Sequence, residues 1–171
     1  MLKEKVESAL NQQINMELQA YYTYLAASAY FEERSLKGFA QWMYHHSQEE
    51  MQHAMKLYHF IHSRRGNVTL NAIAAPKQDW QSADDVIRDA LEHEQKVTAS
   101  IDALVKLARA EGDYATDSFL QWFVDEQVEE EEVVDDLLQK LNLIGDFKPG
   151  LYLLDRELAG GATAEQEGLA A

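Results

Sequence analysis

The residues best suited to chemistry in this sequence are acidic and amide side chains, with one histidine, placed among apolar residues at helical spacing. Glu50 and His53 are three positions apart, so on a helix they share one face and point toward the same region. Gln127 and Glu130 repeat this spacing later in the chain. The residues expected to face inward are Glu17, Glu50, His53, Glu94, Gln127 and Glu130.

Four inward carboxylates at neutral pH require cations between them, because like charges in a buried space repel strongly. An oxygen-rich set with a single imidazole suits iron or manganese better than a tetrahedral zinc site. The absence of cysteine excludes disulfides, thiolate metal sites and iron–sulfur clusters. The sequence therefore predicts a paired-metal site, with iron as the redox-active occupant.

Simpler interpretations apply to each feature taken alone. A Glu-x-x-His pair is common on exposed helices, and a structural salt-bridge core is the main alternative for the whole set. That core would need buried lysine or arginine, which the apolar stripes around these residues lack. Tyr24 and Trp122 are expected as packing aromatics in the absence of other information. The remaining histidines are interpreted as structural or surface residues, although His46 has an acidic residue three positions later: His45, His46, His59, His62 and His93.

The acidic run over 125–132 is ordinarily a solvated helix face. Part of it has a regular spacing, because Glu126, Glu129 and Glu130 fall together on a helix and Glu49 immediately precedes Glu50. The sequence thus predicts a second acidic patch beside the paired-metal site.

Composition limits the classes of function. The 171 residues are 46% hydrophobic, which is enough for one domain with a full core. A formal charge of -15 disfavours a nucleic-acid partner and favours small cations. The first residues carry no apolar signal segment and no apolar run reaches membrane-spanning length, so we expect a soluble cytoplasmic protein without a membrane partner.

The elements that must position these residues are long helices, because the only prolines are Pro76 and Pro149. Ser82 and Asp113 have the position of helix caps. Two helical hairpins joined by a long crossover over 66–81 predict an all-α four-helix bundle. The expected helices cover about 2–31, 36–65, 83–111 and 114–144, with a short amphipathic helix over 151–158. We expect one domain over 1–159 and a flexible tail over 160–171.

Several motifs give the chain a specific resemblance. They are Asn15-Met16-Glu17-Leu18, Gln48-Glu49-Glu50-Met51-Gln52-His53, Glu94-Gln95, Phe119-Leu120-Gln121-Trp122, Glu126-Gln127-Val128-Glu129-Glu130-Glu131 and Gly150-Leu151-Tyr152. With these motifs, residues 1–158 resemble the non-haem bacterial ferritins. The resemblance implies a ferritin-like four-helix bundle with a long B–C crossover and a short fifth helix at the C-terminus. It also implies iron storage in a homo-oligomeric shell of twenty-four subunits.

The resemblance implies roles for particular residues. One iron is held by Glu17, Glu50 and His53, and Glu50 bridges to the second. The second iron is held or approached by Glu50, Glu94 and Glu130, with Gln127 beside it. A third iron position uses Glu49, Glu126, Glu129 and Glu130. In such ferritins Fe(II) is oxidised by dioxygen, and the residues matching Tyr24 and Trp122 supply extra electrons.

The chain also departs from related families. Bacterioferritins and rubrerythrins carry a second Glu-x-x-His in the fourth helix, where this chain has Gln127-Val128-Glu129-Glu130. Met51 coincides with the haem-binding residue of bacterioferritins, but one methionine is a weak signal and haem is not expected. The alternatives are a passive metal-storage shell, a haem-containing bacterioferritin-like protein, a DNA-protecting mini-cage and a monomeric di-iron oxygenase. The lack of lysine and arginine over 162–171 disfavours the mini-cage.

Overall fold

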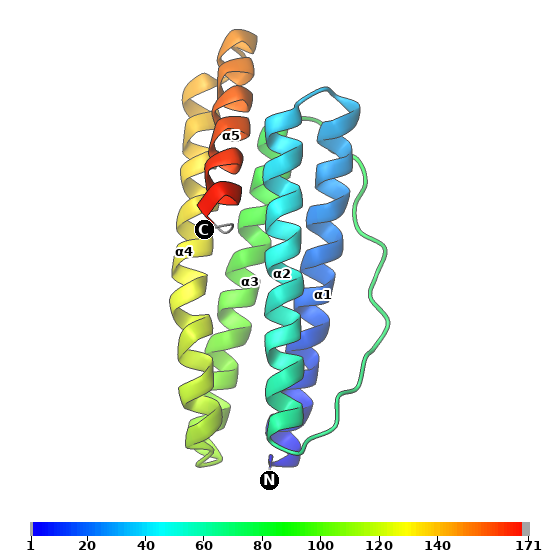
Figure 1. Ribbon diagram of the computed structural model, residues 1–171, viewed down its shortest axis with the longest axis vertical. Coiled ribbons are helices and arrows are strands. Elements are labelled where there is room, and N and C mark those ends of the chain that lie inside the picture. Colours follow the sequence, from blue (N-terminus) through cyan, green and yellow to red (C-terminus); the bar gives the residue numbers. More distant parts are fainter. Residues whose placement is uncertain (1, 169–171) are drawn as a thin grey trace.

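Five helices make up the fold in a computed structural model, which describes the backbone of residues 2–168 and the side chains of residues 2–160. They are α1 (Glu4–Glu33), α2 (Lys37–Ser63), α3 (Ala83–Ala110), α4 (Tyr114–Ile144) and α5 (Lys148–Gly168). The hairpin of α1 and α2 lies beside the hairpin of α3 and α4, forming the predicted four-helix bundle (Figure 1). No helix in the described part of the chain combines the length and apolar character needed to cross a membrane.

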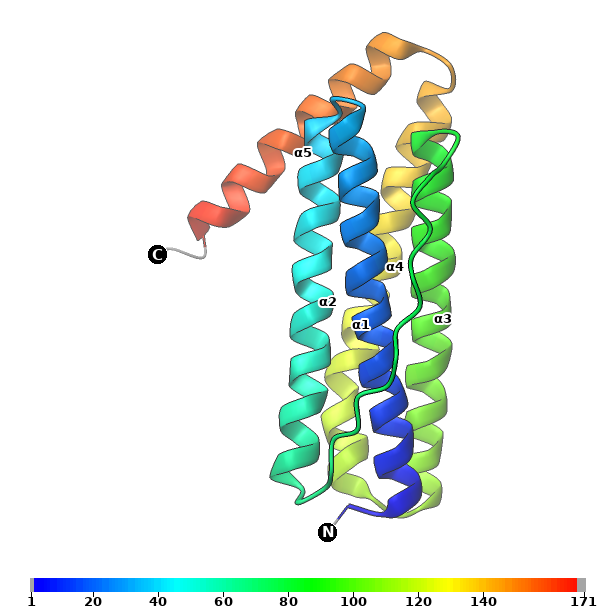
Figure 2. The ribbon, with the colours of Figure 1, turned by 90° about the vertical axis from the view of Figure 1, so that its right-hand side faces the viewer.

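The connection between α2 and α3 crosses the whole length of the bundle, as predicted (Figure 2). Such a segment cannot pair its own backbone groups, so side chains of α1 supply partners. Asn11 donates through Nδ2 to the carbonyl of Asn67 (2.9 Å) and accepts through Oδ1 from the amide of Thr69 (2.7 Å). Gln19 makes the same two-way exchange with the backbone of Ala74. These amide pairs hold the crossover against α1.

Local capping explains where α3 and α4 begin. Ser82 Oγ accepts from the amide of Asp85 (3.1 Å), and Asp113 Oδ1 accepts from the amide of Thr116 (3.1 Å). Both predicted caps are confirmed. The end of α2 lies slightly earlier than the predicted stop after residue 65, because Arg65 adopts a left-handed φ of 57° that ends the helix after Ser63.

The first turn of α2 is capped by a residue distant in sequence. Its N-cap residue is Leu36, whose side chain cannot accept a hydrogen bond. Instead, Asp155 Oδ1 in α5 accepts from the amide of Phe39 (3.0 Å). Gly38 permits this close approach, since a Cβ at that position would lie 1.7 Å from the carbonyl oxygen of Asp155. α5 therefore docks where it completes α2, and Figure 2 shows it crossing the end of the bundle at an angle.

α5 is longer than the 151–158 segment expected from the sequence. It begins at Lys148 because Pro149 sits in the first helical turn, where a missing amide hydrogen costs nothing. It continues past Gly160, since a glycine inside a helix costs only about 1 kcal/mol. The predicted flexible tail over 160–171 falls almost wholly where the structure describes no side chains, with 169–171 outside the described residues. The domain division stays a prediction.

The core consists of two apolar clusters separated by a polar layer. The Phe39 cluster, at the α5 end, includes Tyr24, Met43, Ala90 and Val134. The Phe123 cluster, at the other end, includes Ile14, Leu57, Val97 and Leu120. On every helix of the bundle, the apolar stripe is interrupted at the level between these clusters. The buried residues of this polar layer are Glu17, Glu50, His53, Glu94, Gln127 and Glu130.

Replacing Asp155 by alanine should lower the free energy of unfolding by about 1–2 kcal/mol, because the first turn of α2 loses its cap in a buried setting. Guanidinium unfolding of the wild type and the variant measures this difference. The matched control is Glu157→Ala, which removes an exposed contact to Lys140 and should change stability little. Equal midpoints for the two variants would show that the carboxylate of Asp155 does not hold α5 on α2.

Candidate metal centre

The polar layer brings together one or two side chains from each helix of the bundle. Each is at most 6% exposed, and all of them face the interior as predicted. The periodicity of the four helices explains this arrangement, since each polar residue replaces an apolar one within a stripe that is otherwise continuous. The contributors are Glu17 from α1, Glu50 and His53 from α2, Glu94 from α3, and Gln127 and Glu130 from α4.

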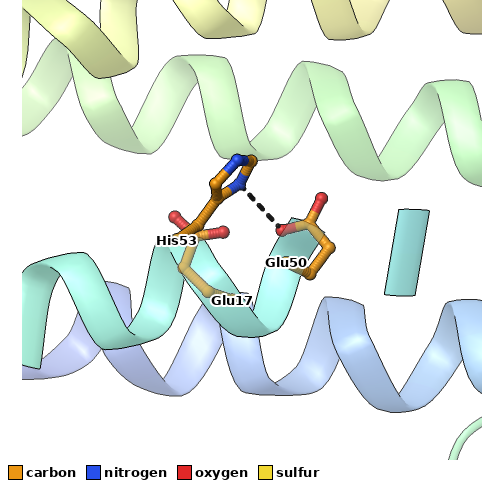
Figure 3. Close-up of side chains that lie close together, drawn as sticks. All are labelled: Glu17, Glu50 and His53. Carbon is orange, nitrogen blue, oxygen red and sulfur yellow. Dashed lines mark ion pairs between the residues drawn. The ribbon is translucent and has the colours of Figure 1, made fainter. Parts of the chain in front are cut away.

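Glu17, Glu50 and His53 form one group with metal-ligand geometry. One ligand atom from each lies within 4.8 Å of the others, and Figure 3 shows the three side chains converging. His53 Nδ1 lies 3.4 Å from Glu50 Oε2. Gln13 Nε2 donates to Glu17 Oε1 (2.9 Å), whereas Glu17 Oε2 and Glu50 Oε2 have no hydrogen-bond partner in the described part of the chain. Two buried carboxylate oxygens without donors are what a cation would satisfy.

Glu94 lies on the other side of the layer with its oxygens already bonded. The hydroxyl of Tyr24 donates to Glu94 Oε1 (2.5 Å), and Gln127 Nε2 donates to Glu94 Oε2 (3.2 Å). These bonds fix the orientation of the carboxylate toward the centre of the bundle. They also connect Tyr24, a candidate electron donor, directly to the layer.

Glu130 lies where the layer meets a cavity of about 440 Å³. Two further groups with metal-ligand spacing include it, one with His46 and Glu49 and the other with His53 and Glu126. The cavity lies between α2, α4 and the middle of α5. Its polar lining consists of His45, His46, Glu49, Glu126, Glu129, Glu130 and Glu157.

Burial and mutual repulsion make the layer costly to ionise. Burial first, then the charge of Glu50, raises the pKa of Glu17 well above its usual value. Burial and the charges of Glu94 and Glu130 do the same to the pKa of Glu50. Burial and Glu130 raise the pKa of Glu94 to about 7, although bonds from Tyr24 and Gln127 oppose the shift. A divalent ion would displace these protons and compensate the repulsion.

The same geometry excludes the salt-bridge alternative. No lysine or arginine is buried among residues 2–160, so the layer has no permanently charged protein cation to neutralise it. The donor set is rich in oxygen, with one imidazole in the first group, and it fits a hard or borderline divalent ion such as Fe(II).

Comparison with known proteins agrees with this donor set. A model of the ferritin-like domain, that of the family named Ferritin, matches residues 7–144. The chain belongs to the ferritin family.

Individual ferritins resemble the whole chain. A bacterial non-heme ferritin of Staphylococcus aureus is 40% identical over 167 residues, which is 98% of this chain and 100% of that protein. A probable bacterial non-heme ferritin-like protein of Haemophilus influenzae is 37% identical over 95% of this chain and 99% of its own length. The open pore ferritin of the archaeon Archaeoglobus fulgidus superposes with a TM-score of 0.91 at 46% identity, covering 92% of this chain and 98% of that one.

The remaining residues predicted for this ferritin are distributed around the layer. Trp122 is 37% exposed and its ring meets His53 edge-on, with 5.5 Å between ring centroids. Glu126 Oε1 lies 3.7 Å from His53 Nε2. Glu129 lines the cavity but is exposed and joins none of the three groups found among the described residues.

Two polar residues near the layer were not among the predicted ligands. Gln13 supports Glu17 from one helical turn away, and His46 faces Glu130 across the bundle. A local signal exists for each, since Gln13 precedes Glu17 by four positions and His46 precedes Glu49 by three. From the sequence alone, His46 was expected to have a structural or surface role.

The raised pKa of Glu94 has a consequence for stability. The carboxyl of Glu94 has a pKa of about 7 in the folded protein, against 4.5 for an unperturbed glutamate. Its contribution to the free energy of unfolding is therefore fully present below pH 4.5 and is lost as the pH rises to 7. Glu94→Gln removes this dependence. In metal-free protein, the free energy of unfolding of the variant relative to the wild type should therefore rise by about 1–3 kcal/mol from pH 5 to pH 8.

Denaturant unfolding in a chelating buffer at the two pH values measures this gain. Glu92→Gln is the matched control, because Glu92 is exposed on the same helix and pairs with Lys96 at its surface. If the difference in free energy of unfolding between Glu94→Gln and the wild type were the same at pH 5 and pH 8, the pKa of Glu94 would not be raised in the folded protein.

Proposed function

We propose that this ferritin stores iron, oxidising Fe(II) with dioxygen at the polar layer and keeping the Fe(III) product as mineral inside a twenty-four-subunit cage. The observation that carries the proposal is the pair of buried, donor-free oxygens of Glu17 and Glu50 beside His53, with no buried lysine or arginine among the described residues to neutralise them. The similarity of the chain to a bacterial non-heme ferritin and to an archaeal ferritin supports the proposal.

Two ferrous ions are the substrates of the layer. Glu17, Glu50 and His53 hold the first, and Glu50, Glu94 and Glu130 hold the second, with Glu50 between them. Each Fe(II) gives up one electron, so a pair supplies two electrons to dioxygen in one event. The carboxylates stabilise the ferric product more strongly than the ferrous substrate, because the additional positive charge lies within a low-dielectric site.

The residues of the layer also bind and release protons. The two substrate ions displace protons from the carboxyl groups whose pKa is raised, and Gln127 keeps Glu94 oriented without adding charge. An amide at position 127 makes the site asymmetric, as the sequence indicated.

Product leaves toward the cavity lined by Glu49, Glu126, Glu129 and Glu130, which we propose as the third iron position. Its residues lie nearer the surface than Glu17 and Glu94, so an ion there is better hydrated and less tightly held. We also keep the cytoplasmic location and the homo-oligomeric state predicted from the sequence as parts of this proposal.

Loss of a ligand to the first ion should abolish fast oxidation. In Glu50→Ala and His53→Ala, the rate of Fe(II) oxidation should fall to that in buffer. Stopped-flow absorbance after mixing the anaerobically loaded protein with dioxygen measures it. Glu132→Ala is the control, since Glu132 is exposed on α4 outside the layer and its loss should leave the rate unchanged.

All of these variants should assemble and elute far above the 19.5 kDa of one chain. Elution of the wild type near 19.5 kDa would favour the monomeric oxygenase alternative. A wild type no faster than buffer would make the protein a passive store. If Glu50→Ala oxidised Fe(II) at the wild-type rate, Glu50 would not be a ligand of the site.

Tyr24 and Trp122 are proposed to supply additional electrons to dioxygen. The phenol of Tyr24 donates its hydrogen bond to Glu94 Oε1 at 2.5 Å, so its electron can leave as its proton passes to that carboxylate. Burial and Glu94 raise the pKa of Tyr24, which keeps the proton on the phenol until then. Trp122 is coupled to the layer by its contact with His53.

Freeze-quenched samples of the wild type should show a tyrosyl radical by electron paramagnetic resonance, and Tyr24→Phe should lose that signal. Tyr30→Phe, which changes another buried tyrosine of the same helix, should retain it. A signal of wild-type intensity in Tyr24→Phe would assign the radical to another residue.

A further inference from the structure

His46 is a buried histidine that the proposed mechanism does not use. Its side chain is 9% exposed, and Nδ1 has no hydrogen-bond partner among the residues the structure describes. A buried imidazole normally has its ring nitrogens paired, and an unpaired one has a cost of about 1–3 kcal/mol. The position of this nitrogen therefore requires an explanation.

The nitrogen lies between two carboxylates that come from different helices. Nδ1 is 3.2 Å from Glu49 Oε2 on α2 and 3.4 Å from Glu130 Oε2 on α4. Both are ion-pair contacts, short enough for charge attraction. One ligand atom from each residue lies within 4.8 Å of the other two, which is the spacing expected around a metal ion.

The ring is held in this orientation by aromatic neighbours. Trp42 packs against His46 with 3.9 Å between ring centroids, and Tyr24 stacks on it at 5.8 Å. A ligand whose rotamer is fixed before binding loses little entropy when the ion arrives. The adjoining cavity of about 440 Å³ has room for water molecules to complete the coordination of an ion.

We infer that His46 is a metal ligand and that, with Glu49 and Glu130, it forms a nitrogen-containing cation site beside the paired-metal layer. Glu130 belongs to both, so an ion at this site shares a ligand with the second ion of the layer. The inference rests on the proposed function only in taking Fe(II) as the physiological occupant. It changes the third iron position from a set of carboxylates alone to one with an imidazole.

The imidazole determines which ions the site prefers. Carboxylates alone bind hard ions such as Mg(II), Ca(II) and Fe(III), whereas an imidazole shifts preference toward Fe(II), Co(II) and Zn(II). Because imidazole binds Fe(III) less well than carboxylates do, a ferric product would move on to Glu126 and Glu129 in the same cavity. The site is therefore expected to accept the ferrous ion and release the ferric one.

The competing explanation is that a protonated His46 forms a purely structural ion pair with Glu49 and Glu130. Zn(II) distinguishes the two because it binds without redox chemistry. Crystals of the assembled protein soaked in Zn(II) should show an anomalous peak about 2.0–2.1 Å from His46 Nδ1. A peak in the cavity held only by carboxylates, or no peak there at all, would overturn the assignment of His46.

Calorimetric titration with Zn(II) gives an independent measure in solution. His46→Gln should lose one Zn(II) per chain or weaken its binding at least about tenfold. The control is His62→Gln, a histidine of α2 outside the layer and the cavity, which should bind as the wild type does. If His46→Gln bound Zn(II) like the wild type but unfolded at lower denaturant concentration, the ion-pair explanation would hold.

These results are separate from a test of the proposed function. If the wild type oxidised Fe(II) fast but the Zn(II) soak showed no ion at His46, only the assignment of His46 as a ligand would be wrong. If Zn(II) bound at His46 but the wild type oxidised Fe(II) no faster than buffer, only the proposed ferroxidase activity would be wrong.

Discussion

The repulsion among buried carboxylates in the polar layer is the constraint on which the rest of the structure depends. Glu17, Glu50 and Glu94 are almost fully inaccessible, and burial raises the pKa of each. Such a layer does not stabilise a metal-free fold, so the surrounding structure must supply the free energy. The two apolar clusters on either side of it do so, since they bury aromatic and aliphatic side chains from all four helices of the bundle.

The long helices follow from this arrangement. A polar layer can be flanked by apolar contacts on both sides only if each helix continues for several turns beyond it in both directions. The parallel direction of α2 and α3 then requires a crossover as long as the bundle, which Asn11 and Gln19 hold through backbone hydrogen bonds (Figure 2). α5 completes the first turn of α2 through Asp155, so even this peripheral helix contributes to the element that carries Glu50 and His53.

The sequence predicted those features that are encoded locally. Ser82 and Asp113 act on amides three residues away, and the inward positions of Glu17 and Glu94 follow from helical periodicity. Contacts between distant segments could not be predicted in this way. The length of α5 depends on how glycine and proline are tolerated once Asp155 is docked. The setting of His46 depends on Glu130, which belongs to another helix, and no spacing along one helix reveals that contact.

The protonation of the layer differs from one side to the other. Burial raises the pKa of Glu130 as it does for the other glutamates, but the nearby imidazoles, His46 foremost, lower it further, so the net pKa is below its usual value. Glu130 thus stays ionised beside the cavity while the deeper carboxyl of Glu94 retains a proton near neutral pH. A cation entering from the cavity first meets the charged side and then displaces protons from the interior. The same difference provides a direction for the product, because Glu130, whose pKa is lowered, lies beside the cavity, whereas Glu17 and Glu94, whose pKa values are raised, lie deeper in the layer.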